Sequence, residues 1–232
     1  RQMCIRDSLC REYIDIFSRE VDSTPARVPE MNLDVEEESW RSYKNRGSPR
    51  PQTPQAQAEI KRQLDILLRN KIIRKSNATH YSQIVLASKP NGKFRLCIDY
   101  KRLNETTVHN GWPLPHIKQL LQRIGTARPK YFAVMDMTSG YHQLAMNPNS
   151  IIYTAFVCFM GVFEWLRVPF GLKGAPGFFQ QQLATVVLAG IVHIFCELYL
   201  DDCIVYAQTE TEYLSRLRDV FCLLYTSDAA DE

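Results

Sequence analysis

The sequence predicts an α+β fold whose main sheet is a split βαβ unit with carboxylates at one edge. Three observations indicate this fold. Apolar, β-prone runs flank the adjacent acids Asp201 and Asp202, which is typical of a hairpin with the acids at its turn. A further β-prone run, residues 131–136, ends in Asp136. The order of strand, hairpin, helix and acidic hairpin then places the strand ending at Asp136 beside the Asp201–Asp202 hairpin.

Turn and capping residues define the other elements along the chain. Thr53 and Pro54 predict the start of a helix that ends near Asn70. The Asn-Gly pair at residues 91–92 predicts a hairpin between residues 83–89 and 93–100. A helix with apolar residues from Ile117 to Ile124 is expected to be closed by Gly125. Strands are expected at 153–157 and 162–168, and helices at 176–190 and around 213–221.

The two ends and the first fifty residues differ from the rest of the chain. Residues 1–8 and 224–232 are interpreted as non-native terminal sequence, because QMCIRDS and LYTSDAADE resemble translated adapter sequence. Residues 9–53 have few sustained apolar patterns and are predicted to form an N-terminal arm or linker.

Composition restricts the class of protein. With 232 residues, 45% hydrophobic and 23% charged, the chain suits one large or two small globular domains. The longest apolar run, residues 186–195, is too short to span a bilayer. Seven cysteines without a CxxC pair are expected to be reduced thiols, which favours an intracellular protein and disfavours a zinc site.

Positive charge is concentrated between Arg41 and Lys75. This segment has ten Lys and Arg residues but only two acids, Glu59 and Asp65. One interpretation is a solvated helix face. The other is a surface for phosphate backbones, whose binding would weaken steeply with added salt.

The acidic hairpin has a structural and a catalytic interpretation. Aspartates are common in turns because they tolerate tight backbone geometry. Here, however, residues 203–207 are almost wholly apolar, so the hairpin should be buried in a sheet, where adjacent carboxylates repel each other. Mg²⁺ or Mn²⁺ relieves that repulsion, because both bind hard oxygen ligands. With Asp136 as third ligand, the pattern predicts two divalent ions about 3.5–4 Å apart and phosphoryl transfer, with Lys89 and Arg95 as phosphate ligands.

Four motifs, in order, resemble the reverse transcriptases of gypsy-type long-terminal-repeat retrotransposons. They are KPNGKFRLCIDYKRLN (89–104), VMDMTSGYHQL (134–144), VPFGLKGAPGFFQ (168–180) and YLDD (199–202). The resemblance runs from about Leu9 to Phe221 and implies the fingers and palm of a right-hand polymerase. Residues 54–130 would be mostly fingers, and residues 131–223 palm with an inserted fingers segment. On this resemblance, the given sequence is expected to stop before the family's later palm segment, thumb and ribonuclease H domain.

The resemblance also implies roles for individual residues. Asp136, Asp201 and Asp202 match the metal-binding aspartates, and the carbonyl of Met137 would complete one metal's shell. Tyr141 matches the bulky side chain that excludes a ribose 2′-hydroxyl. His142 is interpreted as a structural neighbour, and Trp112 and Trp165 are expected in the core. The remaining expected contacts are to the nucleotide, from Lys89, Arg95, Ser139, Gly140 and Phe170, and to template or primer, from Gly171 and Tyr199.

The implied activity is RNA-directed DNA polymerisation as part of a retrotransposon polyprotein. A primer 3′-hydroxyl would attack a dNTP with two Mg²⁺ ions as cofactors, or Mn²⁺ in their place. The expected partners are an RNA or DNA template with its primer, dNTPs and the rest of the polyprotein, without a membrane. The expected location is cytoplasmic, in a virus-like particle. Alternatives are a nucleic-acid-binding remnant without catalysis and a metal-dependent sugar-nucleotide transferase.

Overall fold

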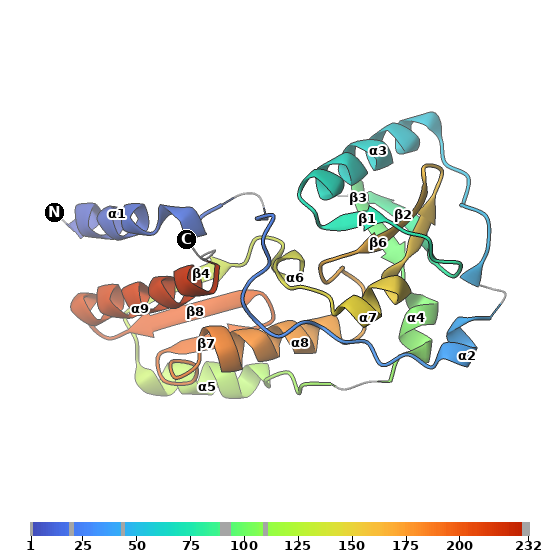
Figure 1. The fold of residues 1–232 in the computed structure, drawn as a ribbon. Helices are drawn as coiled ribbons and strands as arrows, with labels where there is room; N and C mark the ends of the chain where they lie inside the picture. Colours follow the sequence, from blue (N-terminus) through green and yellow to red (C-terminus); the bar gives the residue numbers. More distant parts are fainter. Residues whose placement is uncertain (1, 19–20, 43–44, 89–93, 109–110, 229–232) are drawn as a thin grey trace. The chain divides into compact units, whose positions relative to one another are not determined.

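The computed structural model describes residues 2–18, 21–42, 45–88, 94–108 and 111–228 (Figure 1). The chain forms two compact units, each with its own sheet. Unit 1 consists of residues 1–29, 111–140 and 176–232, and unit 2 of residues 30–110 and 141–175. Both units mix helices and strands, as the sequence predicts.

The sheet of unit 1 contains the acidic hairpin. Among the described residues it has three antiparallel strands in the order β4 (Tyr131–Asp136), β8 (Asp202–Ala207) and β7 (Cys196–Tyr199). The prediction that the strand ending at Asp136 lies beside the hairpin is therefore confirmed. The helical segments of this unit are α1 (Gln2–Glu12), η1 (Ile14–Ile16), α5 (Ile117–Ala127), α8 (Ala175–Gln182), the π-helical η4 (Leu183–Val187) and α9 (Glu210–Asp228).

Both faces of strand β8 are covered by helices. On one face Tyr206 packs against Leu120 and Ile124 of α5, with Ile204 beside them. Side chains alternate along a strand, so Cys203 and Val205 point to the opposite face, where both are fully buried. Helix α9 contacts β8 and β4, and Figure 1 shows α5 and α9 on opposite sides of these strands.

Helix α5 ends later than the sequence predicts. It continues through Gly125 to Ala127, and Arg128 takes the left-handed cap conformation with φ 45°. The predicted closure at Gly125 is therefore wrong. The last turn continues because the cost of one interior glycine, about 1 kcal/mol, is small beside the burial of Leu120 and Ile124.

Trp112, expected in the core, is 38% exposed, whereas Trp165 is buried as predicted.

Unit 2 is built on a mixed sheet. In the described part of the chain its five strands are ordered β1 (Ile73–Lys75), β6 (Gly161–Trp165), β5 (Phe156–Cys158), β2 (Ser82–Ser88) and β3 (Phe94–Asp99). Strands β2 and β5 pair in parallel, and the other neighbours pair antiparallel. The helical segments are α2 (Glu37–Trp40), α3 (Pro54–Arg69), α4 (Lys101–Thr106), α6 (Gly140–Gln143), α7 (Pro148–Ile151) and η3 (Ile152–Thr154).

Two local predictions for unit 2 are confirmed. Helix α3 begins at Pro54, and the Thr53 hydroxyl caps it by accepting the Ala56 N–H at 3.3 Å. Strands β2 and β3 form the predicted hairpin, with Ser88 opposite Phe94. The Asn-Gly turn itself lies outside the described residues.

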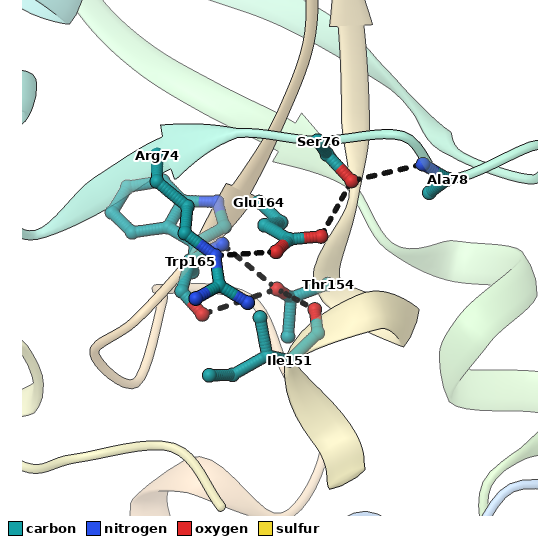
Figure 2. Close-up of polar contacts among 7 residues, drawn as sticks. All are labelled: Arg74, Ser76, Ala78, Ile151, Thr154, Glu164 and Trp165. Carbon is teal, nitrogen blue, oxygen red and sulfur yellow. Dashed lines mark hydrogen bonds and ion pairs between the residues drawn. The ribbon is translucent and has the colours of Figure 1, made fainter. Parts of the chain in front are cut away.

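A polar network joins the edge strand β1 to β6 (Figure 2). The buried carboxylate of Glu164 accepts hydrogen bonds from Arg74 Nε at 2.6 Å and from the Ser76 hydroxyl. Nearby, the buried Thr154 hydroxyl accepts the Trp165 N–H at 2.9 Å and donates to the Ile151 carbonyl at 2.6 Å. These bonds satisfy polar groups that the apolar sheet would otherwise leave unpaired.

The predicted N-terminal arm is anchored by buried residues. Met31, Leu33 and Trp40 are all buried, and Met31 forms a parallel bridge to Met146. The described residues 30–42 and 45–53 are grouped with unit 2. The six cysteines whose side chains the structure describes are free thiols, as predicted. Every helix in the described part of the chain is too short or too polar to cross a membrane.

Candidate active site at the acidic hairpin

Asp136 and Asp202 are direct neighbours across the β4–β8 pair. Residues in this relation have Cβ atoms about 4.5–5.5 Å apart and project from the same face of the sheet. Beyond the strand ends, the Met137 N–H donates to the Asp201 carbonyl at 3.2 Å. The structure thus brings all three predicted aspartates to one edge of one sheet, and all three are exposed.

Among the residues that the structure describes, no cationic side chain pairs with the three carboxylates. Within the described ranges, no Lys, Arg or His forms an ion pair with Asp136, Asp201 or Asp202. Over the same ranges, no three His, Cys, Asp or Glu side chains lie close enough together to hold a metal ion unaided. Mg²⁺, however, binds through one or two carboxylates and completes its shell with water and phosphate oxygens. The facing pair of Asp136 and Asp202 fits that requirement.

The turn between β7 and β8 has a strained backbone. Leu200, which precedes Asp201, has φ 56°, in the left-handed region that non-glycine residues rarely adopt. This conformation costs a leucine about 1–2 kcal/mol. Ser139, three residues after Asp136, is also left-handed, with φ 47°. Such residues persist only where their surroundings hold them, and they concentrate at functional sites.

The loop after Asp136 folds back on itself. The Met137 carbonyl, predicted as a metal ligand, accepts the Gly140 N–H at 3.2 Å and keeps a second lone pair. Gly140 is buried against Phe179 of α8, and a Cβ atom added to it would lie 2.5 Å from the Phe179 ring. A glycine is therefore required here by space, which the sequence alone does not reveal.

Tyr199, predicted to lie near template or primer, is half-buried at the end of β7. Its side chain packs against the cluster of Leu120, Ile124 and Tyr206. Tyr199 therefore contributes to the packing of helix α5 against the sheet.

Further candidate residues lie in unit 2, where they form an aromatic cluster. The Tyr141 and Phe170 rings meet edge to face with centroids 5.0 Å apart. The His142 ring stacks on Trp165 at 5.1 Å and touches Phe170 at 5.0 Å. Phe170 remains 47% exposed, so this cluster presents an aromatic surface to solvent.

The other predicted binding residues of unit 2 are not part of this aromatic cluster. Arg95 is exposed on β3, opposite Ala87, and Lys89 lies outside the described residues. Gly171 has φ 96°, and its carbonyl accepts a hydrogen bond from the Asn104 side chain at 2.8 Å. The Asn104 amide oxygen in turn accepts the Lys173 N–H at 2.8 Å. Sequence reasoning missed Asn104, although it closes the first of the four motifs.

A buried ion pair beneath the hairpin was also missed. The Glu197 carboxylate is fully buried and accepts Arg123 Nε and Nη2 at 2.6 and 2.7 Å, and His193 Nδ1 at 2.9 Å. Burial opposes ionisation of this carboxyl group, but the hydrogen bonds from Arg123 and His193 outweigh it and lower the pKa of Glu197. The sequence signal that could have revealed this ion pair is Glu197 itself, a charged residue within an otherwise apolar strand.

Much of the basic segment is neutralised by ion pairs. Arg41, Arg50 and Arg74 pair with Glu37, Asp99 and Glu164, which lie outside the segment. Lys61 and Arg62 pair within helix α3. The charge available to a phosphate backbone is therefore smaller than the sequence count suggests.

Comparison with known proteins identifies relatives among transposon polyproteins. A family model described as reverse transcriptase (RNA-dependent DNA polymerase) matches residues 87–227. The Pol polyprotein of the Drosophila melanogaster transposon opus is 40% identical over 171 residues, which are 72% of this chain and 17% of that protein. That of transposon 412 is 34% identical over 222 residues, 93% of this chain and 17% of that protein. The chain thus spans about a sixth of these relatives.

Solved structures share the fold. The native protease–reverse transcriptase of prototype foamy virus matches with a TM-score of 0.78 at 22% identity, over 95% of this chain and 29% of that one. The foamy viral enzyme in complex with an RNA/DNA hybrid matches with a TM-score of 0.76 at 23% identity, with the same coverage. The predicted α+β fingers-and-palm fold is thereby confirmed. By its family match and its gypsy-type relatives, the chain belongs to the reverse transcriptases of retrotransposon polyproteins.

Proposed function

We propose that the chain is the catalytic fingers-and-palm part of an RNA-directed DNA polymerase. In the proposed reaction, a primer 3′-hydroxyl attacks the α-phosphate of a dNTP, forms the new phosphodiester and releases pyrophosphate. The observation that carries the proposal is the facing pair of Asp136 and Asp202, exposed at a sheet edge and not ion-paired with any described Lys, Arg or His, in a chain of this family. We also propose that the protein acts inside the cell, in the virus-like particle of the retrotransposon that encodes it.

Three aspartates have the central role in this proposal. Asp136, Asp201 and Asp202 would hold Mg²⁺ or Mn²⁺, and the Met137 carbonyl would use its second lone pair as a further ligand. When bound, two such ions supply activation of the attacking hydroxyl and neutralise charge on the leaving phosphate. Phosphoryl transfer relies mainly on position and positive charge, and the proton of the attacking 3′-hydroxyl would pass to solvent water.

The other candidate residues bind and select the nucleotide. Arg95 grips the triphosphate with its planar guanidinium, and Lys89 adds a second positive charge. Ser139 and Gly140 border the sugar, and Tyr141 with Phe170 forms an aromatic wall against a 2′-hydroxyl. Template and primer pass Gly171 and Tyr199. The foamy viral enzyme solved with an RNA/DNA hybrid supports nucleic acid as the partner class.

The test is Asp201→Asn in the full-length parent polyprotein. The amide keeps the size of the carboxylate but cannot neutralise a divalent cation, so primer extension should be abolished while thermal unfolding is unchanged. Asp219→Asn, which alters an exposed aspartate on helix α9 of the same unit, is the matched control and should extend primers normally.

Two outcomes contradict the proposal. Near-normal primer extension by Asp201→Asn would remove the acidic hairpin from the chemistry. Salt-sensitive binding of primer–template by the unmodified parent without any dNTP incorporation would instead identify a binding remnant.

A further inference from the structure

One buried amide in helix α8 holds the β7 side of the acidic turn. The Gln180 side chain is 4% exposed. Its Nε2 donates to the Leu198 carbonyl at 3.3 Å, and its Oε1 accepts the Leu200 N–H at 2.7 Å. The amide therefore bridges the last residues of β7 and the first residue of the turn, leaving Tyr199 between its two contacts.

The position of these bonds matters because of the conformation of Leu200. A two-residue hairpin with positive φ at its first turn position normally has glycine there. This turn has a leucine with φ 56° instead. The hydrogen bond from its own N–H to Gln180 is the contact that fixes this residue. Because Asp201 and Asp202 follow directly, the orientation of both carboxylates depends on the Leu200 backbone.

The neighbouring residue of α8 contacts the other acidic segment. The Phe179 ring fills the space beside Gly140, in the loop that begins after Asp136. This loop and the turn are also joined directly, by the hydrogen bond from Met137 N–H to the Asp201 carbonyl. Consecutive residues of one helix thus set the positions of the two segments that supply the acids.

We propose that Gln180 is a positioning residue that fixes the acidic turn and thereby sets its affinity for divalent cations. The inference rests on the proposed function, since it assumes that the aspartates hold such ions. Gln180 lies behind the turn and acts through the Leu198 and Leu200 backbone. Loss of an outer partner of this kind weakens metal binding on the order of tenfold to a hundredfold.

A purely structural role makes a different prediction. Buried amides are generally hydrogen-bonded, so Gln180 could serve stability alone. In that case its loss would lower stability without changing metal affinity per folded molecule. Gln182 provides the matched control, because it is 5% exposed on the same helix and its Oε1 has no partner in the part of the chain that is described.

The experiment uses the whole 232-residue chain with Mn²⁺ as the probe. Binding is measured by calorimetry and by the paramagnetic signal of free Mn²⁺, alongside thermal unfolding and amide exchange at Leu200. Gln180→Met should weaken Mn²⁺ binding about tenfold or more and speed exchange of the Leu200 amide. Gln182→Met should change neither quantity.

A second variant separates turn geometry from packing. Leu200→Gly removes the cost of the left-handed conformation, because glycine adopts it freely. In that background Gln180→Met should weaken Mn²⁺ binding less than it does in the original chain. If Gln180→Met alone folds poorly, the double variant is compared with Leu200→Gly alone, and its Mn²⁺ affinity should be less than about tenfold weaker.

The outcomes distinguish this inference from the proposed function. Unchanged Mn²⁺ affinity in folded Gln180→Met, or an equal loss in Gln182→Met, overturns the positioning role alone. Mn²⁺ binding that survives the double variant Asp136→Asn with Asp202→Asn undiminished overturns the metal site, and with it both proposals. A loss of affinity confined to Gln180→Met and relieved by Leu200→Gly supports the inference.

Discussion

Arg123 of α5 and Glu197 of β7 form a two-point ion pair whose carboxylate is fully buried beneath the acidic hairpin. Arg123→Met should lower the free energy of unfolding by about 3 kcal/mol, because it leaves a buried carboxylate without its main partner. Denaturant titration measures this value. The double variant Arg123→Met with Glu197→Leu should recover much of the loss, since it also removes the charge. A double variant no more stable than Arg123→Met would contradict this account.

Glu197 should also make stability depend on pH in the acidic range. Its pKa is lowered, because the hydrogen bonds from Arg123 and His193 outweigh the opposing effect of burial. A lowered folded-state pKa adds stability above the unfolded value, about 4.3, and that stability is lost as pH falls through the folded-state pKa. Glu197→Gln should therefore flatten the fall in unfolding free energy below about pH 4.3. An identical pH profile in both proteins would show that another group is responsible.

The elements defined by local signals could be predicted from the sequence. Thr53 and Pro54 mark a helix start with residues that act within one turn, and strand β4 was predicted with its observed bounds. The pairing of β4 with the acidic hairpin also followed, because few topologies connect these strands in this order. The same connection predicted that Asp136, Asp201 and Asp202 lie at one edge of one sheet.

Contacts between distant residues could not be predicted in this way. Arg123 and Glu197 are 74 residues apart, and Gln180 and Leu200 are 20 apart, so neither pair leaves a periodic pattern. The end of helix α5 was missed because burial of Leu120 and Ile124 outweighed a local glycine signal. Sequence reasoning thus located the acids but not the residues that hold them.

The Thr154 hydroxyl in unit 2 should contribute measurably to stability. Thr154→Val keeps the shape of the side chain but leaves the buried Trp165 N–H without an acceptor, which costs about 1–3 kcal/mol. Ser82→Ala is the control, because the buried Ser82 hydroxyl has no partner elsewhere in the described structure. Its removal should be neutral or slightly stabilising. Equal losses in the two variants, measured by denaturant unfolding, would argue against a specific role for the Trp165 hydrogen bond.

His142 should remain neutral at pH values where histidines are normally charged. Burial, assisted by the charge of Arg167, lowers the pKa of His142 to about 4. The neutral ring stacks on Trp165, so stability is complete above the unfolded pKa of about 6.5 and declines as pH falls toward 4. His142→Phe should keep the stacking and remove this decline. A nuclear magnetic resonance titration giving a pKa near 6.5 would reject the prediction.

Tyr141 should determine sugar selectivity if the proposed polymerase role is correct. Its ring meets that of Phe170 at 5.0 Å, so Tyr141→Ala removes one side of an aromatic wall. The parent polyprotein carrying this change should incorporate ribonucleotides at least about tenfold more readily relative to dNTPs, because the 2′-hydroxyl is the group that distinguishes the two sugars. The measurement is the ratio of kcat/KM for the matched nucleotides in primer extension.

The control for this change is Tyr141→Phe, which keeps the ring and removes only the hydroxyl group. A steric wall needs the ring alone, so Tyr141→Phe should discriminate against ribonucleotides as the unmodified protein does. If selectivity instead depended on the phenolic hydroxyl, both variants would lose it to a similar degree. Unchanged selectivity in Tyr141→Ala, with normal dNTP incorporation, would exclude a gate at this position and move the search to Phe170 and the residues that border it.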